Sequence, residues 1–389
     1  MIRWILASIA CFLIIALAGL HFVAPPMIEN SINGYAPHDP FEISEAASAL
    51  HRDLFIADLH TDTMLWKRDI LEHADRGHVD LPRLQAGNVG LQVFSATTKS
   101  PAGQNYDSNT ADSDRITGLA MGQLWPPRTW GSIYERAAYQ LEKLIAFADA
   151  SNGELVLVGN QQEMASLIER RAAGERVVGA IYLIEGAHPL EGKLENLDRL
   201  YEKGLRVAGL THFFDNRVGG SLHGISGEGL TPFGEDVIRR ANELGIIIDI
   251  AHASPQMVRD ILALSTTPVM LSHGGVKGVC NRNRNLDDDL MVEVAAKGGI
   301  IGIGYWEGAV CDISPRGVVH SIRYAIDLLG LPHVALGSDY DGATTVAFDT
   351  SELAVLTQTM LDEGFTEAEI RAVMGGNVQQ FLLEHLPEN

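Results

Sequence analysis

Apolar residues occur along the chain in two alternating patterns. Short runs rich in Val, Ile, Leu and Gly are separated by longer segments with helical spacing, which is typical of repeated strand–helix units around a parallel sheet. Eight such runs lie at residues 54–60, 90–97, 177–185, 205–212, 245–252, 268–273, 299–305 and 333–339. Because the runs are almost continuously apolar, each strand is expected to be covered on both faces.

The number of strand–helix units indicates the fold class. Eight units in roughly 330 residues match an α/β fold of the (β/α)8 type, a TIM-like barrel with loop insertions. A doubly wound open sheet is the competing architecture, but no strand is followed by a glycine-rich phosphate-binding sequence.

Two further segments support this organisation. Residues 135–150 have helical spacing, and Thr366 with Glu369 forms a capping-box pattern before an apolar segment. Residues 99–130 are rich in Gly, Asn, Asp and Ser and end in a Trp- and Pro-containing stretch. They are expected to be an insertion after the second strand, at the carboxyl face of the barrel where such folds keep their sites.

The N-terminus carries a separate signal. Residues 4–20 are apolar apart from Ser8 and small residues, and Arg3 precedes them. The run lies between a signal-peptide core and the roughly 20 residues of a membrane span, so a cleaved signal peptide and a single N-terminal membrane anchor both stay open. In either case Arg3 is expected to stay in the cytoplasm, with the rest exported to the periplasmic or extracellular side.

The expected domain organisation follows from these segments. Residues 1–24 form the anchor or signal peptide, residues 25–42 form a linker punctuated by prolines and an Asn-Gly pair, and residues 43–389 form the barrel. The chain has 29 basic and 50 acidic residues and a net charge of −21, which disfavours nucleic acid and anionic membrane surfaces as partners. The oligomeric state is left open, with a homodimer as one alternative.

Ionisable residues stand where the predicted strands end. These residues are His60, Asp62, Glu185, His212, His252, His273 and Asp339. In a barrel the carboxyl ends of the strands meet at one mouth, so residues far apart in sequence can surround one ion.

The residue types at this mouth predict a metal site. His60 and Asp62 are two positions apart, so both side chains lie on one face of a strand, and imidazole and carboxylate are ligands that Zn²⁺ accepts. Alone, the pair would fit a core histidine and a capping aspartate. The complete set exceeds the three ligands of a single catalytic zinc and favours two ions roughly 3.5 to 4 Å apart that share a hydroxide, with Glu185 as the bridging carboxylate.

The motifs that carry these residues resemble a known family. They are DLHTDT at 58–63, IEGAHPL from 184, LTHFFDNRVGGS from 210, DIAHAS from 249, LSHGGVKGVCNRNRN from 271 and GSDYDG from 337. In this order they resemble the renal, or membrane, dipeptidase family of zinc hydrolases, from about residue 54 to the C-terminal helix. The resemblance implies a metallo-dipeptidase whose substrate is a small dipeptide.

The resemblance also implies the metal ligands. It assigns one zinc to His60 and Asp62 and a second zinc to His252 and His273, with Glu185 between the two ions. The tolerance of a D-residue at the second position of the dipeptide is left open.

Three further residues receive roles in binding and catalysis. His212 is implied as a substrate-facing residue that stabilises the oxyanion, and Asp339 as a proton shuttle that also contacts substrate. Arg284 is implied to bind the terminal carboxylate of the dipeptide, with Arg282 as the alternative. Asp341 is expected to be a structural or rim carboxylate.

The two cysteines of the predicted barrel also match the family. Cys280 and Cys311 resemble the positions of a disulfide pair known there, and two free thiols are the alternative. The chain has no long apolar C-terminal tail of the kind that signals a lipid anchor in animal members, so any attachment to a membrane is expected at the N-terminus.

Two other functions stay open at this point. One is a different metal-dependent amidohydrolase that acts on N-acyl amino acids, lactones or cyclic amides, because the same hydroxide would attack each of these groups. The other is a non-catalytic exported binding protein that keeps the barrel and a metal. The complete set of ligands together with Asp339 favours a hydrolase.

Overall fold

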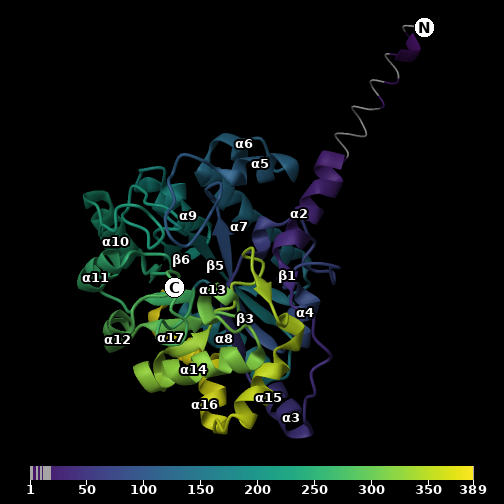
Figure 1. Cartoon of the computed structure of the whole chain (residues 1–389), viewed down its shortest axis with the longest axis vertical. Coiled ribbons are helices and arrows are strands. Elements are labelled where there is room, and N and C mark those ends of the chain that lie inside the picture. The colour runs from purple at the N-terminus through teal and green to yellow at the C-terminus, as the bar shows by residue number, and fades with distance from the viewer. Residues whose placement is uncertain (1–2, 6–7, 9–10, 12–18, 389) are drawn as a thin grey trace.

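The centre of the protein is a closed ring of parallel strands surrounded by helices (Figure 1). The computed structural model describes residues 3–5, 8, 11 and 19–388. The eight strands of the ring are β2 Ile56–Thr61, β3 Val89–Thr97, β5 Val178–Glu185, β6 Leu205–Gly209, β7 Ile247–Asp249, β8 Met270–Gly274, β9 Ile300–Ile303 and β10 Val334–Leu336. They follow one another in chain order, and β10 pairs with β2 to close the ring. The predicted (β/α)8 barrel is confirmed.

Every predicted apolar run overlaps one strand of the ring. Most strands are shorter than their runs, most clearly β7, which has three residues within the predicted range 245–252, whereas β3 begins one residue before its run. Three short strands were not predicted. The strand β4 (Leu155–Leu157) pairs with the start of β5, and β1 (Gly34–Tyr35) pairs with β11 (Thr345–Val346) outside the ring.

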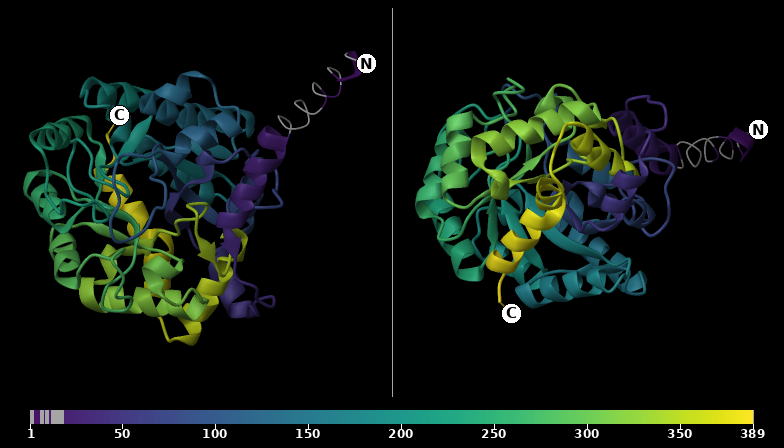
Figure 2. Two further views of the ribbon diagram at one scale, coloured as in Figure 1. Left: turned by 45° about the horizontal axis from the view of Figure 1, so that its top comes forward. Right: turned by 90° about the horizontal axis from the view of Figure 1, so that it is seen from below.

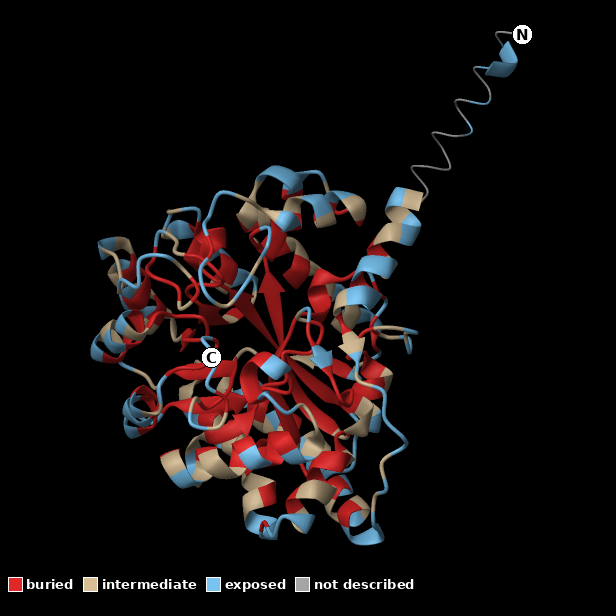
Figure 3. Cartoon of the chain, in the orientation of Figure 1, coloured by how far each residue is buried: buried red, intermediate tan, exposed pale blue. Residues whose placement is uncertain are grey.

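Two clusters of apolar side chains pack the ring of strands, one against the surrounding helices and one against the C-terminal helix. Nearly all strand residues are buried, whereas the outer faces of the helices are exposed (Figure 3). One apolar cluster lies between the strands and the surrounding helices, and a second joins residues of the strands to Phe381 and Leu382 of α17 (Asn377–His385). In the right view of Figure 2 this C-terminal helix, in yellow, lies in front of the strands. Continuous burial explains why the strands read as continuous apolar runs.

The helices begin mostly at Ser, Thr, Asp or Asn residues whose side chains cap the first turn, as at Ser254 and Ser314. The predicted capping box of Thr366 and Glu369 is present. The helices are α2 Ala24–Ile32, α3 Glu45–Arg52, α4 Leu81–Ala86, α5 Arg115–Gly122, α6 Arg128–Gly131, α7 Ile133–Ala150, α8 Gln161–Ala172, α9 Glu195–Lys203, α10 Pro232–Leu244, α11 Pro255–Leu264, α12 Asp288–Ala296, α13 Glu307–Val310, α14 Pro315–Leu329, α15 Ala354–Asp362, α16 Glu367–Arg371 and α17. Single turns or π-helical segments are η1 Gly19–Val23, η2 Thr63–Leu65, η3 His188–Leu190, η4 Leu331–His333, η5 Thr350–Glu352 and η6 Ala372–Gly376.

The expected linker differs from the structure in its first part. Residues 24–35 form α2 and β1, and both elements pack against the barrel. Pro25 and Pro26 occupy the first turn of α2, where proline is compatible with a helix because the backbone N–H groups there have no intrahelical partner. In the sequence, the same two prolines favoured a linker over a helix, which is why α2 was not expected. The division of the chain at residues 24 and 42 stays a prediction.

The membrane anchor or signal peptide is not tested by the fold. Most of the apolar run at 4–20, on which that prediction rests, lies outside the described residues. Within the described part of the chain, no helix is both long and apolar enough to cross a membrane.

Candidate active site at the carboxyl end of the barrel

The strand ends bring all the predicted site residues into one buried cluster. His60 and His273 lie in β2 and β8, Glu185 is the last residue of β5, and the other residues follow their strands directly. The side chains predicted as ligands or catalytic groups are 0 to 8% exposed, namely His60, Asp62, Glu185, His212, His252, His273, Arg284 and Asp339. The loop after β8 adds Arg284, which lies beneath Trp306, with the guanidinium carbon 5.3 Å from the ring centre.

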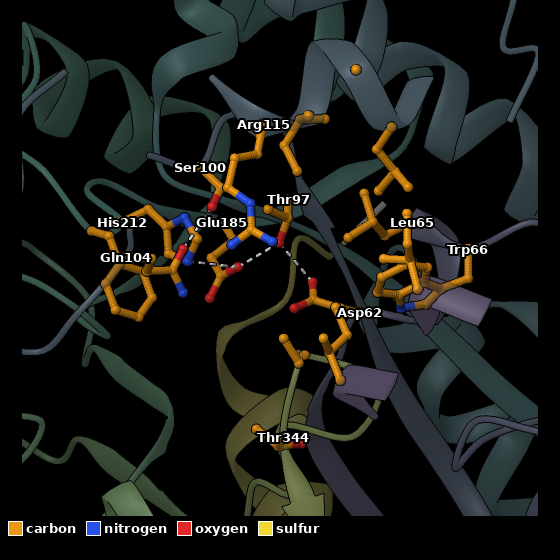
Figure 4. Close-up of a pocket in the computed structure, with 18 of the residues that line it drawn as sticks. Asp62, Leu65, Trp66, Thr97, Ser100, Gln104, Arg115, Glu185, His212 and Thr344 are labelled. Carbon is orange, nitrogen blue, oxygen red and sulfur yellow. Dashed lines mark hydrogen bonds and ion pairs between the residues drawn. The ribbon is translucent and has the colours of Figure 1, made fainter. Parts of the chain in front are cut away.

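Glu185 lies at the centre of this cluster. Its Oε1 is 3.1 Å from Nε2 of His252, 3.5 Å from Nε2 of His273 and 3.7 Å from Nε2 of His60. Its Oε2 is 3.4 Å from Nε2 of His212. Figure 4 shows the carboxylate of Glu185 between His212 on one side and Asp62 on the other. One carboxylate therefore contacts imidazoles from four different strand ends.

The second half of the cluster surrounds His60. Its Nε2 is 3.9 Å from Oδ1 of Asp62 and 3.9 Å from Oδ1 of Asp339. This nitrogen is buried and has no hydrogen-bond partner among the described residues. A buried polar atom without a partner is costly unless a ligand satisfies it.

Three hydroxyl groups orient these side chains, and sequence reasoning missed them. The hydroxyl of Thr97 at the end of β3 lies 2.7 Å from Oε2 of Glu185 and 3.0 Å from Oδ1 of Asp62. The hydroxyl of Ser272 lies 2.9 Å from Nδ1 of His273 and donates to Asp249 at 2.6 Å. Ser338 donates to Asp58. Partners on Nδ1 turn Nε2 toward the centre, as the outer partners of metal-binding histidines do.

Burial and mutual charge shift the pKa values of the cluster in different directions. Burial alone would raise the pKa of Glu185, but the charges of His212, His60 and His273 outweigh burial and lower it to about 2. Burial raises the pKa of Asp339 well above its usual range, and the charges of Asp62 and Glu185 add to this effect. The same surroundings thus shift the pKa values of two carboxyl groups of one site in opposite directions.

The histidines also differ in pKa. Burial alone would lower the pKa of His60, but contact with Asp62 and the charges of Glu185 and Asp339 outweigh burial and raise it to about 10. Burial lowers the pKa of His252 and of His273, and the nearby charge of Arg284 lowers both further. Their Nε2 atoms lie 3.1 Å apart. Two neutral imidazoles whose nitrogens converge in this way present lone pairs to a common point, as metal ligands do.

The donor set fits divalent metal ions of the zinc type. Groups of three side chains with ligand atoms within 4.8 Å of one another are His60, Glu185 and His273; Glu185, His212 and His252; and His60, Asp62 and Asp339. Imidazole nitrogens mixed with carboxylate oxygens are typical zinc ligands, and the unpartnered Nε2 of His60 points into the same space.

Arg284 and Arg282 have different surroundings. Arg284 is buried, and its Nη2 donates to the backbone oxygen of His273 at 3.0 Å. No carboxylate oxygen of the described residues lies within 4.0 Å of its guanidinium nitrogens, so its charge is available to a ligand. Arg282 is exposed and pairs with Glu307 at 2.6 Å. The geometry therefore favours Arg284 over Arg282 as the anion-binding residue.

Asp341 has a structural environment, as expected. Its carboxylate accepts hydrogen bonds from the hydroxyl of Thr63 and the backbone N–H of His78, both at 2.7 Å, and pairs with Arg68. By contrast, Asp339 lines a pocket. His252, Asp339 and Asp341 all have positive φ angles, a strained conformation for residues other than glycine that persists only where the surroundings enforce it.

The cluster forms the floor of a pocket of about 440 Å³. Its walls include Ser100, Tyr106 and Arg115 from the segment 99–130, which contains α5 and α6. The predicted position of this insertion at the mouth of the barrel is confirmed. A pocket of this size suits a small molecule with polar groups at fixed positions.

A model of one protein family matches residues 44–385, and its description is membrane dipeptidase, peptidase family M19. This range contains every residue of the cluster. The chain belongs to the membrane dipeptidase family. The predicted resemblance and the predicted enzyme type, a metallo-dipeptidase, are confirmed at the level of the family.

A relative and two solved structures are similar to this chain over most of its length. Dipeptidase 3 of Mus musculus is 30% identical over 371 residues, which cover 87% of this chain and 66% of the mouse protein. The chain thus spans about two thirds of the length of that relative. A metallopeptidase of Rhodobacter sphaeroides, solved with a phosphinate mimic of the dipeptide L-Ala-D-Ala, has a TM-score of 0.69 at 22% identity over 86% of this chain and 99% of its own. The probable dipeptidase PvdM of Pseudomonas aeruginosa has a TM-score of 0.72 at 18% identity over 88% of this chain and 98% of its own. These structures support the fold.

The disulfide implied by the family resemblance is present. Cys280 follows β8 and Cys311 follows α13, and their sulfur atoms lie 2.05 Å apart. The bond ties the loop that carries Arg284 to the segment after β9, beside Trp306. Two free thiols are therefore excluded in this structure.

Proposed function

We propose that this member of the membrane dipeptidase family hydrolyses dipeptides in a zinc-dependent reaction. The observation that carries the proposal is the combination of a central carboxylate, Glu185, surrounded by imidazoles, with a buried and unpaired guanidinium, Arg284, in the same pocket. A dipeptide has a carboxylate at one end and an ammonium group at the other. Arg284 supplies the charge opposite to the carboxylate, and a pocket of about 440 Å³ leaves room for a molecule of this size.

We propose two zinc ions for this site. His60 and Asp62 would hold one ion, His252 and His273 would hold the other, and Glu185 would be shared between the two. The support is that Oε1 of Glu185 lies within 3.7 Å of Nε2 of His60, His252 and His273, and that Asp62 lies on the side of Glu185 opposite His212. When bound, such ions supply a water of lowered pKa and polarise the scissile carbonyl.

Each remaining residue then has a defined part. Arg284 binds the terminal carboxylate, which fixes the peptide bond over Glu185. His212 lines the pocket beside Oε2 of Glu185 and can donate a hydrogen bond to the developing oxyanion. Burial and neighbouring charges raise the pKa of Asp339, which favours the protonated form that can deliver a proton to the departing amine.

The test of this proposal compares free dipeptides with their N-acetyl derivatives, in L,L and L,D forms. Rapid cleavage of the free dipeptides alone is expected, because N-acetylation removes the ammonium charge and adds bulk to the first residue in a pocket of about 440 Å³. Equal rates for N-acetylated substrates would instead favour the alternative, an amidohydrolase of N-acyl amino acids, lactones or cyclic amides. The L,D dipeptides test whether a D-residue is tolerated at the second position. They are included because the R. sphaeroides metallopeptidase was solved with a mimic of L-Ala-D-Ala.

The place of action is also a proposal. The apolar run at 4–20 supports export to the periplasmic or extracellular side, with a membrane tether if the run is retained. Fractionation of cells that express the full chain, with and without alkaline extraction of the membranes, separates a tethered from a released protein.

A further inference from the structure

The N-terminal helix forms one wall of the proposed active site. Its contribution to the pocket comes from Ala24, Pro25, Ile28 and Ile32 of α2, preceded by Leu20 of η1. These positions recur at about four-residue spacing, so they share one face of a continuous helical segment. Every one of these side chains is apolar, and Ile28 is 43% exposed. The wall is therefore apolar surface that a ligand can cover.

Apolar residues of the barrel continue this wall. Ile32 packs against a buried cluster that contains Leu65, Trp66 and Ile116, and these three residues also line the pocket. Figure 4 shows Leu65 and Trp66 beside Asp62, on the opposite side of Glu185 from His212. The pocket thus has a polar side at His212 and an apolar side at α2.

A buried ion network fixes α2 to the barrel. Glu29 is 1% exposed and pairs with Arg68 at 2.5 Å and with Arg76 at 2.8 Å. Arg68 also pairs with Asp341 in the loop that carries Asp339. Because removal of one partner from a buried ion pair leaves an uncompensated charge, the helix has a strongly preferred position.

The end of α2 is fixed to the same loop. The side-chain oxygen of Asn33 accepts a hydrogen bond from the backbone N–H of Ala343 at 2.8 Å, and the backbone N–H of Gly34 donates to the oxygen of Thr344 at 3.1 Å. Ala343 has a positive φ angle, as Asp339 does. Contacts from residues 33 and 34 thus help to hold a strained loop of the site.

The family match does not include this wall. It begins at residue 44, so α2 and β1 lie before the matched range. The motifs and the family model therefore account for the floor of the pocket, and residues 20–35 add a feature to it.

We propose that α2 gives this enzyme a preference for dipeptides with a bulky apolar first residue. The inference rests on the proposed dipeptidase function. Arg284 lies over the ring of Trp306, whose Nε1 donates to Tyr106, and Tyr106 stacks on Phe213 beside His212, so Arg284 belongs to the polar side. With the carboxylate there, the first residue would lie toward Asp62, on the opposite side of Glu185 from His212. Its side chain then meets Ile28, Ile32 and Leu65. A hydrophobic pocket distinguishes substrates that differ by one methylene about 10- to 200-fold.

The test uses the full-length enzyme, its Ile28→Asp variant and a matched Met27→Asp control. Met27 is exposed on the same helix and does not line the pocket. For each protein, kcat/KM is measured for Gly-Ala, Leu-Ala and Phe-Ala and for the reversed series Ala-Gly, Ala-Leu and Ala-Phe. Ile28→Asp is expected to lower the ratio of Leu-Ala to Gly-Ala by about tenfold or more, since a charge replaces apolar contact surface. Met27→Asp should leave this ratio within a factor of two.

The outcomes separate this inference from the function on which it rests. If the wild-type enzyme cleaves none of the dipeptides, the proposed function fails. If it cleaves them but Ile28→Asp lowers all rates equally, or changes only the reversed series, the inference is overturned and the dipeptidase function stands. Thermal unfolding of the variants identifies any general loss of structure, which would lower all rates together.

Discussion

Replacement of Arg284 by methionine should weaken the recognition of the substrate carboxylate and leave the fold intact. Arg284 is buried, and its only hydrogen bond within the described chain goes to the oxygen of His273. Two charge-assisted hydrogen bonds to a carboxylate contribute about 1.5 kcal/mol or more each, so their loss should cost at least about 3 kcal/mol, or roughly 150-fold in kcat/KM.

The assay is a double-mutant-type cycle in which the change in the enzyme is combined with a change in the substrate. Wild-type and Arg284→Met enzymes are compared on a dipeptide and on its C-terminal carboxamide, and Arg282→Met is the control because Arg282 is exposed and paired with Glu307. The carboxamide should be a poor substrate for the wild type, and the substitution should then add little further loss. Equal cleavage of carboxamide and dipeptide by the wild type, or a loss in Arg282→Met as large as in Arg284→Met, would refute the assignment.

Three further predictions concern the proton donor, a buried histidine and the disulfide. Asp339→Asn should lower kcat by about 10²- to 10⁴-fold while the metal content, measured by mass spectrometry, stays that of the wild type. Burial lowers the pKa of His51 from 6.5 to about 4, so the unfolded chain binds more protons between these values. Up to about 3 kcal/mol of the free energy of unfolding should therefore be lost as the pH falls from 6.5 to 4. In urea unfolding, the His51→Gln variant should not show this loss. Replacement of Cys280 and Cys311 by serine should lower stability by about 4 kcal/mol, the value for a loop of this length, and an unchanged unfolding midpoint would contradict it.

The barrel could be predicted from sequence because buried strands and amphipathic helices alternate regularly along the chain. Strands that are buried on both faces, such as β5, produce continuous apolar runs, and an ionisable residue at the end of such a run has few structural explanations. The positions of His60, Glu185 and His273 at the ends of predicted strands therefore indicated that their side chains meet at the mouth of the barrel.

Other parts of the site depend on contacts that sequence does not encode locally. Thr97 and Ser272 are common residue types, and their roles appear only when the barrel brings them beside Glu185 and His273. The strand β4 has three residues, too few for a periodic signal. The helix α2 was read as a linker because of its prolines, and its place in the pocket results from the long-range ion pairs of Glu29.

The central claim, two zinc ions held around Glu185, is tested most directly by metal titration. Chelator-treated enzyme is supplied with defined amounts of Zn²⁺, and bound metal is measured together with the rate of dipeptide cleavage. Two ions per chain at full activity are predicted, and Glu185→Gln should reduce the bound metal. Full activity at one ion per chain, or in the absence of metal, would contradict the two-metal site.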